Sequence, residues 1–147
     1  MALPKKTPSP MTMKLDAMKN KNNDCAVLVA EDNPSVREFV VRALAGAGYR
    51  VTQAGDGQQA LDILAREPFA VLVTDIVMPN VDGIALALKA VQQFPGLRIV
   101  MISGYAQERM RAHNLDALVH KVIAKPFSVE DICAAVRDAL ALPPGAV

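Results

Sequence analysis

Five polar residues of this sequence stand at the ends of short apolar runs, and their types suit phosphoryl chemistry. The runs are CAVLVAED, AVLVTD, LRIVMIS and LVHKVIAK. If they form parallel strands, their carboxyl ends share one edge of a sheet, where open α/β sheets bind ligands. Carboxylate oxygens suit Mg²⁺, and a carboxylate can accept a phosphoryl group as an acyl phosphate. The residues expected to converge are Glu31, Asp32, Asp75, Ser103 and Lys125.

The charges of this cluster favour a bound divalent cation. Neighbouring carboxylates repel one another, and one of them would normally take up a proton. The three carboxylates carry −3 and the Lys125 ammonium carries +1, so the cluster has a net charge of −2 that one Mg²⁺ neutralises. The ion and Lys125 would offset charge on the transferring oxygens, and Ser103 could donate a hydrogen bond to the phosphoryl group.

From residue 24 onward, the sequence alternates strand and helix signals. The apolar runs are typical of buried strands, and residues with capping or turn chemistry separate them from helical repeats. Strands are expected over 25–30, 49–54, 70–74, 97–102 and 118–124. A short helix is expected over 106–113. The other helices are expected to start at Asn33-Pro34, Asp56-Gly57, Asp82-Gly83 and Ser128, and to end at Gly48, at Pro68, before Pro95 and near Leu140.

Five strand–helix units predict an α/β fold, a (βα)₅ doubly wound parallel sheet. Short connections and right-handed crossovers lead to this arrangement, and five strands fit the flavodoxin-like strand order 2-1-3-4-5. In that order the first and third strands are neighbours, which would set Asp32 beside Asp75. The last helix is expected to carry an apolar side, formed by Val129, Ile132, Cys133, Val136 and Leu140.

Length and composition fit one compact domain with short tails. The chain has 147 residues, is 52% hydrophobic and contains no Trp, so its core must consist mostly of Val, Ile, Leu and Ala. Residues 1–23 hold five Lys and one Asp, a net charge of +4, and show no sustained period. We expect a flexible basic tail over 1–23, a folded domain over 24–142 and a short C-terminal tail over 143–147.

Charge and hydropathy patterns disfavour several classes of function. Outside the tail, 11 basic and 14 acidic residues leave a net charge of −3, so no nucleic-acid-binding surface is expected. No apolar run approaches the ~18 residues of a membrane span, and no apolar stretch follows the first basic residues as in a secretory signal. Cys25 and Cys133 lack metal-ligand spacing and are expected to be free thiols of a cytoplasmic protein. His113 and His120 are expected at the surface or in loops.

Four motifs, in order and each at a predicted strand end, resemble a CheY-like receiver domain of two-component response regulators. They are AED near the start, DIVMPNVDG in the middle, and SGY and KPF near the end. The resemblance covers about residues 24–142. It implies that Asp75 accepts a phosphoryl group from a phosphohistidine. It also implies that Ser103 fills the family's hydroxyl switch position and Lys125 its lysine position.

The same resemblance implies a metal site and one unusual peptide bond. Asp32 and Asp75 would bind Mg²⁺ directly, Glu31 would bind it through water, and the backbone carbonyl of Val77 would complete the ligand set. The peptide bond before Pro126 would be cis, as it is in the family, although few X–Pro bonds are.

A narrower resemblance is to CpdR-type single-domain regulators of alphaproteobacteria. It is carried by MPNVDGIALALKAV and ISGYAQERMRAHNLDALVHKVIAKPFS, together with the lack of residues for an output domain. In that family the unphosphorylated regulator primes the ClpXP protease for selected substrates, and phosphorylation by a histidine-kinase phosphorelay switches this off. The expected partners are therefore a histidine kinase or histidine phosphotransfer protein and a ClpX-type protease component.

Two other functions stay open at the level of the sequence. The protein could be a phosphorelay intermediate or phosphate sink, which only passes its phosphoryl group on or loses it. It could also be a phosphohydrolase of the haloacid-dehalogenase type, but those enzymes usually need Asp-x-Asp and position 77 is Val. We therefore expect a phospho-acceptor, with at most slow loss of its own phosphate, rather than an enzyme.

One position departs from the receiver pattern and directs attention to a tyrosine. Receivers usually carry an aromatic residue three positions before the lysine, but here that residue is Val122, so no ring can act as a switch there. Tyr105, two residues after Ser103, could instead swing over the phosphoryl group, shield it from water and reshape the helix that follows. The alternative is a half-buried Tyr105 that only packs.

Overall fold

The described part of the chain forms a parallel sheet with helices on both faces. The structure, a computed structural model, describes residues 25–104 and 119–142. The strands in these ranges are all parallel and lie in the order β3-β2-β4-β5-β6, which confirms the predicted order 2-1-3-4-5. They are β2 (Ala26–Ala30), β3 (Arg50–Ala54), β4 (Val71–Asp75), β5 (Arg98–Ser103) and β6 (Lys121–Ala124).

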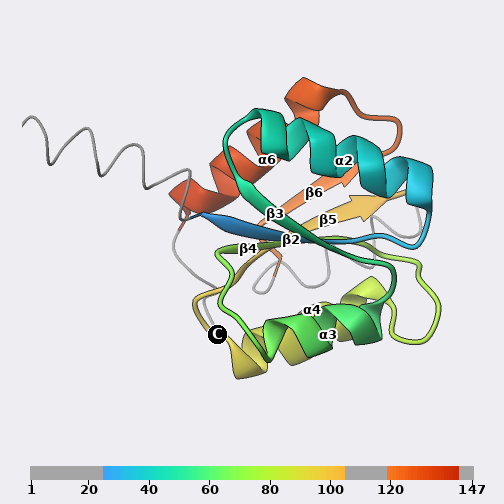
Figure 1. Cartoon of the computed structure of the whole chain (residues 1–147), viewed down its shortest axis with the longest axis vertical. Coiled ribbons are helices and arrows are strands. Elements are labelled where there is room, and N and C mark those ends of the chain that lie inside the picture. Colours follow the sequence, from blue (N-terminus) through green and yellow to red (C-terminus); the bar gives the residue numbers. More distant parts are fainter. Residues whose placement is uncertain (1–24, 105–118, 143–147) are drawn as a thin grey trace, which may run out of the picture.

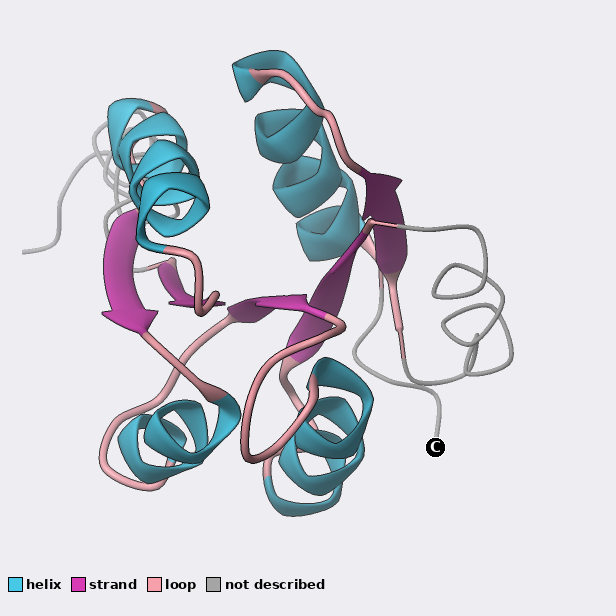
Figure 2. Cartoon of the chain, turned by 90° about the vertical axis from the view of Figure 1, so that its right-hand side faces the viewer, coloured by secondary structure: helices cyan, strands magenta, loops and turns pink. Residues whose placement is uncertain are grey.

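The helices of the described residues cover the sheet in pairs. Figures 1 and 2 show α2 and α6 together on one face and α3 and α4 together on the other. The central strands β2, β4 and β5 are buried on both of their faces because both faces are covered. None of these helices is long and apolar enough to cross a membrane. They are α2 (Pro34–Gly46), α3 (Gly57–Leu64), α4 (Gly83–Gln93) and α6 (Val129–Ala141).

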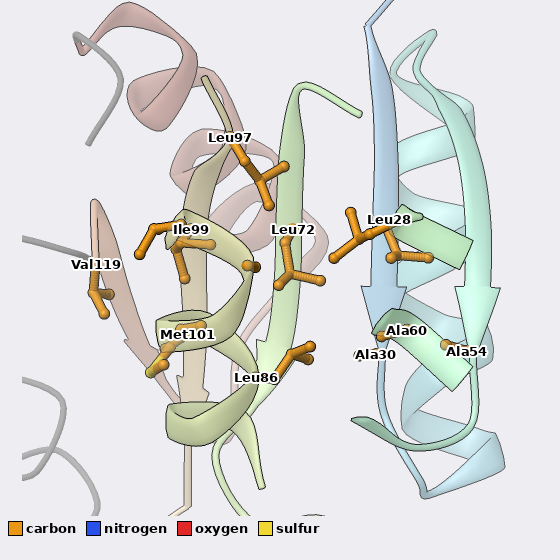
Figure 3. Packing of buried hydrophobic residues seen from close by; sticks show 14 of the residues in the cluster. Leu28, Ala30, Ala54, Ala60, Leu72, Leu86, Leu97, Ile99, Met101 and Val119 are labelled. Atoms are coloured by element: carbon orange, nitrogen blue, oxygen red, sulfur yellow. The ribbon is translucent and has the colours of Figure 1, made fainter. Parts of the chain in front are cut away.

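Alternate residues of each central strand supply two hydrophobic cores. On β2, Leu28 and Ala30 belong to the core beside α3 and α4, whereas Val27 and Val29 belong to the core beside α2 and α6. Figure 3 shows the first of these cores. Aliphatic side chains dominate both, as the composition predicts. The first core also includes Leu72, Leu86, Ile99 and Met101, and the second includes Val40, Leu44, Val73, Ile102 and Ile132.

Every described helix begins with the capping residue that the sequence predicts. The capping side chains accept hydrogen bonds from backbone N–H groups of the first turn, which have no partner within the helix. Ser128 and Asp131 form a capping box, in which each side chain accepts a hydrogen bond from the other residue's N–H group. The other caps are Asn33 on α2, Asp56 on α3 and Asp82 on α4.

The other helix predictions agree with the structure only in part. Gly48, two residues beyond α2, has a φ of 99°, the left-handed conformation that commonly ends a helix. The helix α3 ends at Leu64 rather than at Pro68, because backbone N–H groups of the next turn share the carbonyl of Ile63 as their hydrogen-bond acceptor. Val129, the first residue of α6, is 46% exposed. Side chains of a helix tilt toward its N-terminus, and the side chain of the first helical residue therefore projects beyond the end of the helix.

The strand boundaries differ slightly from the prediction. Both β4 and β5 lie one residue later than expected, so Asp75 and Ser103 are the last residues of their strands. The strand β6 begins at Lys121 rather than at residue 118. Just before it, the N–H of His120 donates to the carbonyl of Ile99 (2.8 Å), and the N–H of Ile99 donates to the ring Nδ1 of His120 (3.0 Å). His120 thus lies in the loop just before β6, which agrees with its expected surface or loop position, and its half-buried ring extends the contact between β5 and the start of β6.

Some predicted features lie outside the described residues. They are the flexible tail over 1–23, Tyr105, the short helix over 106–113 with His113, and the C-terminal tail over 143–147. The two cysteines, Cys25 and Cys133, are described, and they are not joined in a disulfide.

Gly83, the first residue of α4, lies against the backbone at the end of β4. Its N–H donates to the carbonyl oxygen of Ile76 (2.7 Å). A Cβ atom at position 83 would overlap the carbonyl oxygen of Asp75 and crowd the Cα of Ile76. Only glycine permits this approach of one backbone to another. The segment after β4 is therefore folded back and held at the edge of the sheet.

The substitution Gly83→Ala is expected to lower the free energy of unfolding by about 1–3 kcal/mol, the usual cost of overpacking. Gly46→Ala is the matched control, because Gly46 ends α2 and a Cβ there meets no atom within 4 Å. That control should raise the free energy of unfolding by about 0.5–1 kcal/mol. Urea unfolding measures both, and equal effects of the two substitutions would contradict the close contact at position 83.

Candidate functional site

Three carboxylates meet at the carboxyl edge of the sheet. Glu31 and Asp32 follow β2, and Asp75 ends the neighbouring strand β4. One oxygen of each side chain lies within 4.8 Å of the other two. Glu31 is 1% exposed and Asp75 is 5% exposed, whereas Asp32 is exposed to solvent. The cluster is thus buried on its sheet side and open to an incoming group on the side of Asp32.

One ammonium group reaches these carboxylates from the loop after β6. The Nζ of Lys125 is 3.3 Å from Oδ1 of Asp75 and 3.9 Å from Oε1 of Glu31. The lysine side chain is 34% exposed, so solvent weakens these ion pairs only in part. The peptide bond between Lys125 and Pro126 is cis, which is the conformation that the family resemblance implies.

Ser103 and Val77 lie at the same edge of the sheet. Ser103 is fully buried at the end of β5, next to β4, and its hydroxyl donates to the carbonyl of Ile123 on β6. The distance of 3.5 Å makes this a long, weak hydrogen bond. Val77 follows β4 by two residues, and its side chain is exposed. The residues predicted from the strand ends are therefore brought to one place.

Burial raises the pKa of Glu31 to about 7, mainly because the charged form loses its hydration. The negative charge of Asp75 raises this pKa further, while the N–H of Asn33, which donates to Oε2 of Glu31 (3.1 Å), and the charge of Lys125 lower it. The other oxygen, Oε1, is buried and accepts no hydrogen bond from any described residue. A buried oxygen in this condition favours a cation or a cation-bound water as its neighbour. The donor set therefore fits Mg²⁺, which prefers carboxylate oxygens and water.

Thr74 and Arg37 contribute to the site but were not predicted. The buried Thr74 hydroxyl donates to the backbone carbonyl of Asp75 (2.9 Å) and lies 4.0 Å from the Sδ of Met78. Its signal in the sequence is a lone hydroxyl within the apolar run AVLVTD. The Nη1 of Arg37 donates to the backbone carbonyl of Glu31 (2.8 Å). This contact depends on tertiary geometry, and no local pattern indicates it.

The sequence as a whole matches a known family. The sequence profile of the response regulator receiver domain matches residues 27–137. The chain belongs to this family. Receivers are phospho-acceptor switches that take their phosphoryl group from histidine kinases or histidine phosphotransfer proteins, and they bind Mg²⁺ at an acidic pocket. The cluster of Glu31, Asp32 and Asp75 is the acidic pocket that this receiver presents.

Individual relatives agree with the family assignment. The response regulator receiver protein CpdR of Brucella abortus is 42% identical over 106 residues, which cover 72% of this chain and 88% of that protein. The solved structure of a CheY-like receiver domain protein from Methanospirillum hungatei is similar with a TM-score of 0.74 and 26% identity, over 80% of this chain and 94% of that chain. The fold is also shared with TrrA of Thermotoga maritima, solved in complex with Mg²⁺ and BeF, at a TM-score of 0.72 and 22% identity over 78% of this chain and 98% of that chain.

The raised pKa of Glu31 makes the stability of the metal-free receiver depend on pH. The folded protein holds this proton more tightly than the unfolded chain, because the pKa is about 7 in the fold and ordinarily 4.5. The stability from this group is therefore complete below the ordinary pKa and is lost as pH rises through the folded value. Glu31→Gln removes the titration, so its free energy of unfolding should fall less than that of the wild type between about pH 5 and 8.

Urea unfolding at several pH values, without Mg²⁺, measures this difference. Glu38→Gln is the matched control, because Glu38 lies exposed on α2 and forms a surface ion pair with Arg42 (2.8 Å). This control should follow the wild-type profile. Parallel profiles for the wild type and Glu31→Gln would show that Glu31 keeps its ordinary pKa in the fold.

Proposed function

We propose that this protein is a cytoplasmic response regulator in which Asp75 is phosphorylated by a histidine-kinase phosphorelay. Its phosphorylation state then controls binding to another protein, and through it ClpXP-type regulated proteolysis. The observation that carries the proposal is the approach of Lys125 to Asp75, 3.3 Å between Nζ and Oδ1, beside two further carboxylates. This arrangement suits a carboxylate nucleophile whose product carries more negative charge than the reactant.

The chemistry follows from the groups around Asp75. A carboxylate oxygen of Asp75 attacks the phosphorus of a phosphohistidine, the new O–P bond forms as the P–N bond breaks, and the bonding electrons leave with the imidazole nitrogen. The Lys125 ammonium offsets charge on the transferring oxygens. Asp32 and Asp75 would hold Mg²⁺ directly, Glu31 through water and Val77 through its carbonyl, and the bound ion supplies further charge compensation.

Phosphorylation would act on the two adjustable groups at the sheet edge. It adds roughly one to two negative charges at Asp75. The Ser103 hydroxyl would leave its weak bond to Ile123 and donate to the phosphoryl group, while Lys125 would move toward the new charge. A switch from mostly off to mostly on takes about 5.5 kcal/mol. One hydrogen bond to a charged group contributes about 1.5–3 kcal/mol, so the Ser103 hydrogen bond would supply part of this energy and the closer approach of Lys125 would add to it.

Tyr105 is proposed as the aromatic switch residue, although it lies outside the described residues. Its place two residues after Ser103 would let the ring cover the phosphoryl group and exclude water. The half-life of the acyl phosphate should therefore be shorter in Tyr105→Ala than in the wild type. An unchanged half-life would leave Tyr105 as a packing residue.

Support for the protease partner comes from the identity to CpdR. We propose that the unphosphorylated form binds a ClpX-type component and that phosphorylation releases it. The surface that binds would be one that changes when Ser103 and Lys125 move, since those residues lie at the ends of β5 and β6.

Replacing the proposed acceptor tests the central step. The Asp75→Ala protein should form no acyl phosphate when incubated with a phosphorylated histidine phosphotransfer protein and Mg²⁺, because the nucleophile is absent. Asp62→Ala is the matched control, since Asp62 lies exposed on α3 and its carboxylate accepts only a surface hydrogen bond from Gln58 (3.1 Å) among the contacts described. Labelling that resists mild acid but is removed by base and by hydroxylamine measures the product. Labelling that persists in Asp75→Ala would refute the assignment.

The same proteins test the downstream function. Purified ClpX-type unfoldase should bind unphosphorylated wild type and Asp75→Ala alike, and should bind the phosphorylated wild type less. Binding that ignores the phosphorylation state, together with rapid return of the phosphoryl group to the phosphotransfer protein, would instead identify a relay or phosphate sink.

A further inference from the structure

Arg37, in the first turn of α2, ties three elements together at the acidic pocket. Its Nη1 donates to the backbone carbonyl of Glu31 (2.8 Å), just beyond β2, and its Nε donates to Oε1 of Gln53 (3.1 Å) on β3. Gln53 is the register partner of Val29, two residues before Glu31 along the chain. The planar guanidinium presents these donors in a fixed geometry. It therefore fixes the end of β2 relative to both α2 and β3.

The segment held in this way is the one that carries two of the three carboxylates. The C-terminal end of this segment is anchored to α2, because the backbone N–H of Arg37 donates to the carbonyl of Asn33 (2.9 Å). Asn33 in turn donates its own N–H to Oε2 of Glu31 and caps the helix with its side chain. Glu31, Asp32 and Asn33 thus form a short loop, and Arg37 donates hydrogen bonds to both of its ends.

The guanidinium of Arg37 also lies close to the residue that follows β3. A Cβ atom at position 55 would lie 3.5 Å from Nη1 of Arg37 and 3.4 Å from Oε1 of Gln59. The N–H of Gly55 donates to that same oxygen of Gln59 (2.7 Å). The half-buried Arg37 therefore extends from the end of β2 to the end of β3, and its two hydrogen bonds join these strand ends.

We propose that Arg37 is a positioning residue of the metal pocket, an inference that rests on the Mg²⁺ site of the proposed function. By fixing the carbonyl of Glu31 and the loop that follows, it keeps the exposed carboxylate of Asp32 within reach of Asp75. Asp32 is the member of the cluster whose exposure leaves it most free to turn away. The positive charge of Arg37 acts in the opposite direction, because it repels a cation.

These two effects predict opposite results when Arg37 is replaced. If positioning dominates, Arg37→Ala should raise the dissociation constant for Mg²⁺ by about three- to tenfold, at or below the lower end of the range for residues that orient metal ligands. If charge dominates, the same substitution should lower that constant. Arg37→Lys keeps the charge but cannot make the forked contact, so it should bind Mg²⁺ more weakly than the wild type as well.

Titration calorimetry with MgCl₂ on the unphosphorylated protein measures these constants. Arg42→Ala is the control for charge, because Arg42 lies on the same helix and forms an ion pair with the exposed Glu38. It should leave the constant unchanged or lower it slightly. Gln53→Ala removes one of the two hydrogen-bond acceptors of the Arg37 side chain. It should also raise the dissociation constant for Mg²⁺, but by a smaller factor than Arg37→Ala does.

The outcomes separate this inference from the proposed function. Urea unfolding without Mg²⁺ shows which variants are folded, and Arg37→Lys and Gln53→Ala remain informative if Arg37→Ala does not fold. Unchanged or tighter Mg²⁺ binding in all folded variants would overturn the positioning role while the metal site stands. Failure of the wild type to bind Mg²⁺ would overturn both the metal site and this inference.

Discussion

The structure depends on holding three like charges together at one edge of a sheet. Carboxylate oxygens of Glu31, Asp32 and Asp75 lie within 4.8 Å of one another, and Lys125, the lysine that faces them within residues 25–104 and 119–142, balances only part of their charge. Repulsion would separate these groups in a pliable chain. Here β2 and β4 are adjacent, hydrogen-bonded and covered on both faces, so neither strand can slip without exposing its apolar residues. The packing of the two hydrophobic cores thus holds the mutually repelling carboxylates together in the pocket.

Around this rigid frame, the groups that respond to a phosphoryl group are weakly held. Thr74 and Gly83 fix the main chain of Asp75 from two sides, through a hydrogen bond and a backbone contact. By contrast, the Ser103 hydroxyl has a 3.5 Å hydrogen bond to Ile123, and Lys125 is partly exposed. A new charge at Asp75 can therefore redirect these two side chains at low cost, while the strands stay in place. The adjustable groups stand at the ends of β5 and β6, which directs any response toward that side of the molecule.

Most of the pocket could be predicted from the sequence, because the carboxyl ends of parallel strands lie at one edge of the sheet and the strand order determines which of them are adjacent. Once the apolar runs are assigned to strands, the order 2-1-3-4-5 is sufficient to place Asp32 beside Asp75, and helix caps follow from residues such as Asn33. The errors concern the places where elements begin and end. The helix α3 ends at Leu64 rather than at Pro68, and β6 begins at Lys121 rather than at residue 118. Arg37 was missed because its contacts join residues that only the fold brings together.

The close contact between Gly83 and the backbone at the end of β4 also restricts how the sequence of this receiver can differ from those of its relatives. A second glycine imposes a similar limit, since a Cβ atom at Gly57 would overlap the carbonyl of Val81. Between these two fixed points, Val77 and Pro79 present exposed side chains. Natural variation in this loop can accumulate there without disturbing the acids, so the rim of the pocket can be reshaped for different signalling partners while the chemistry beneath it is inherited intact.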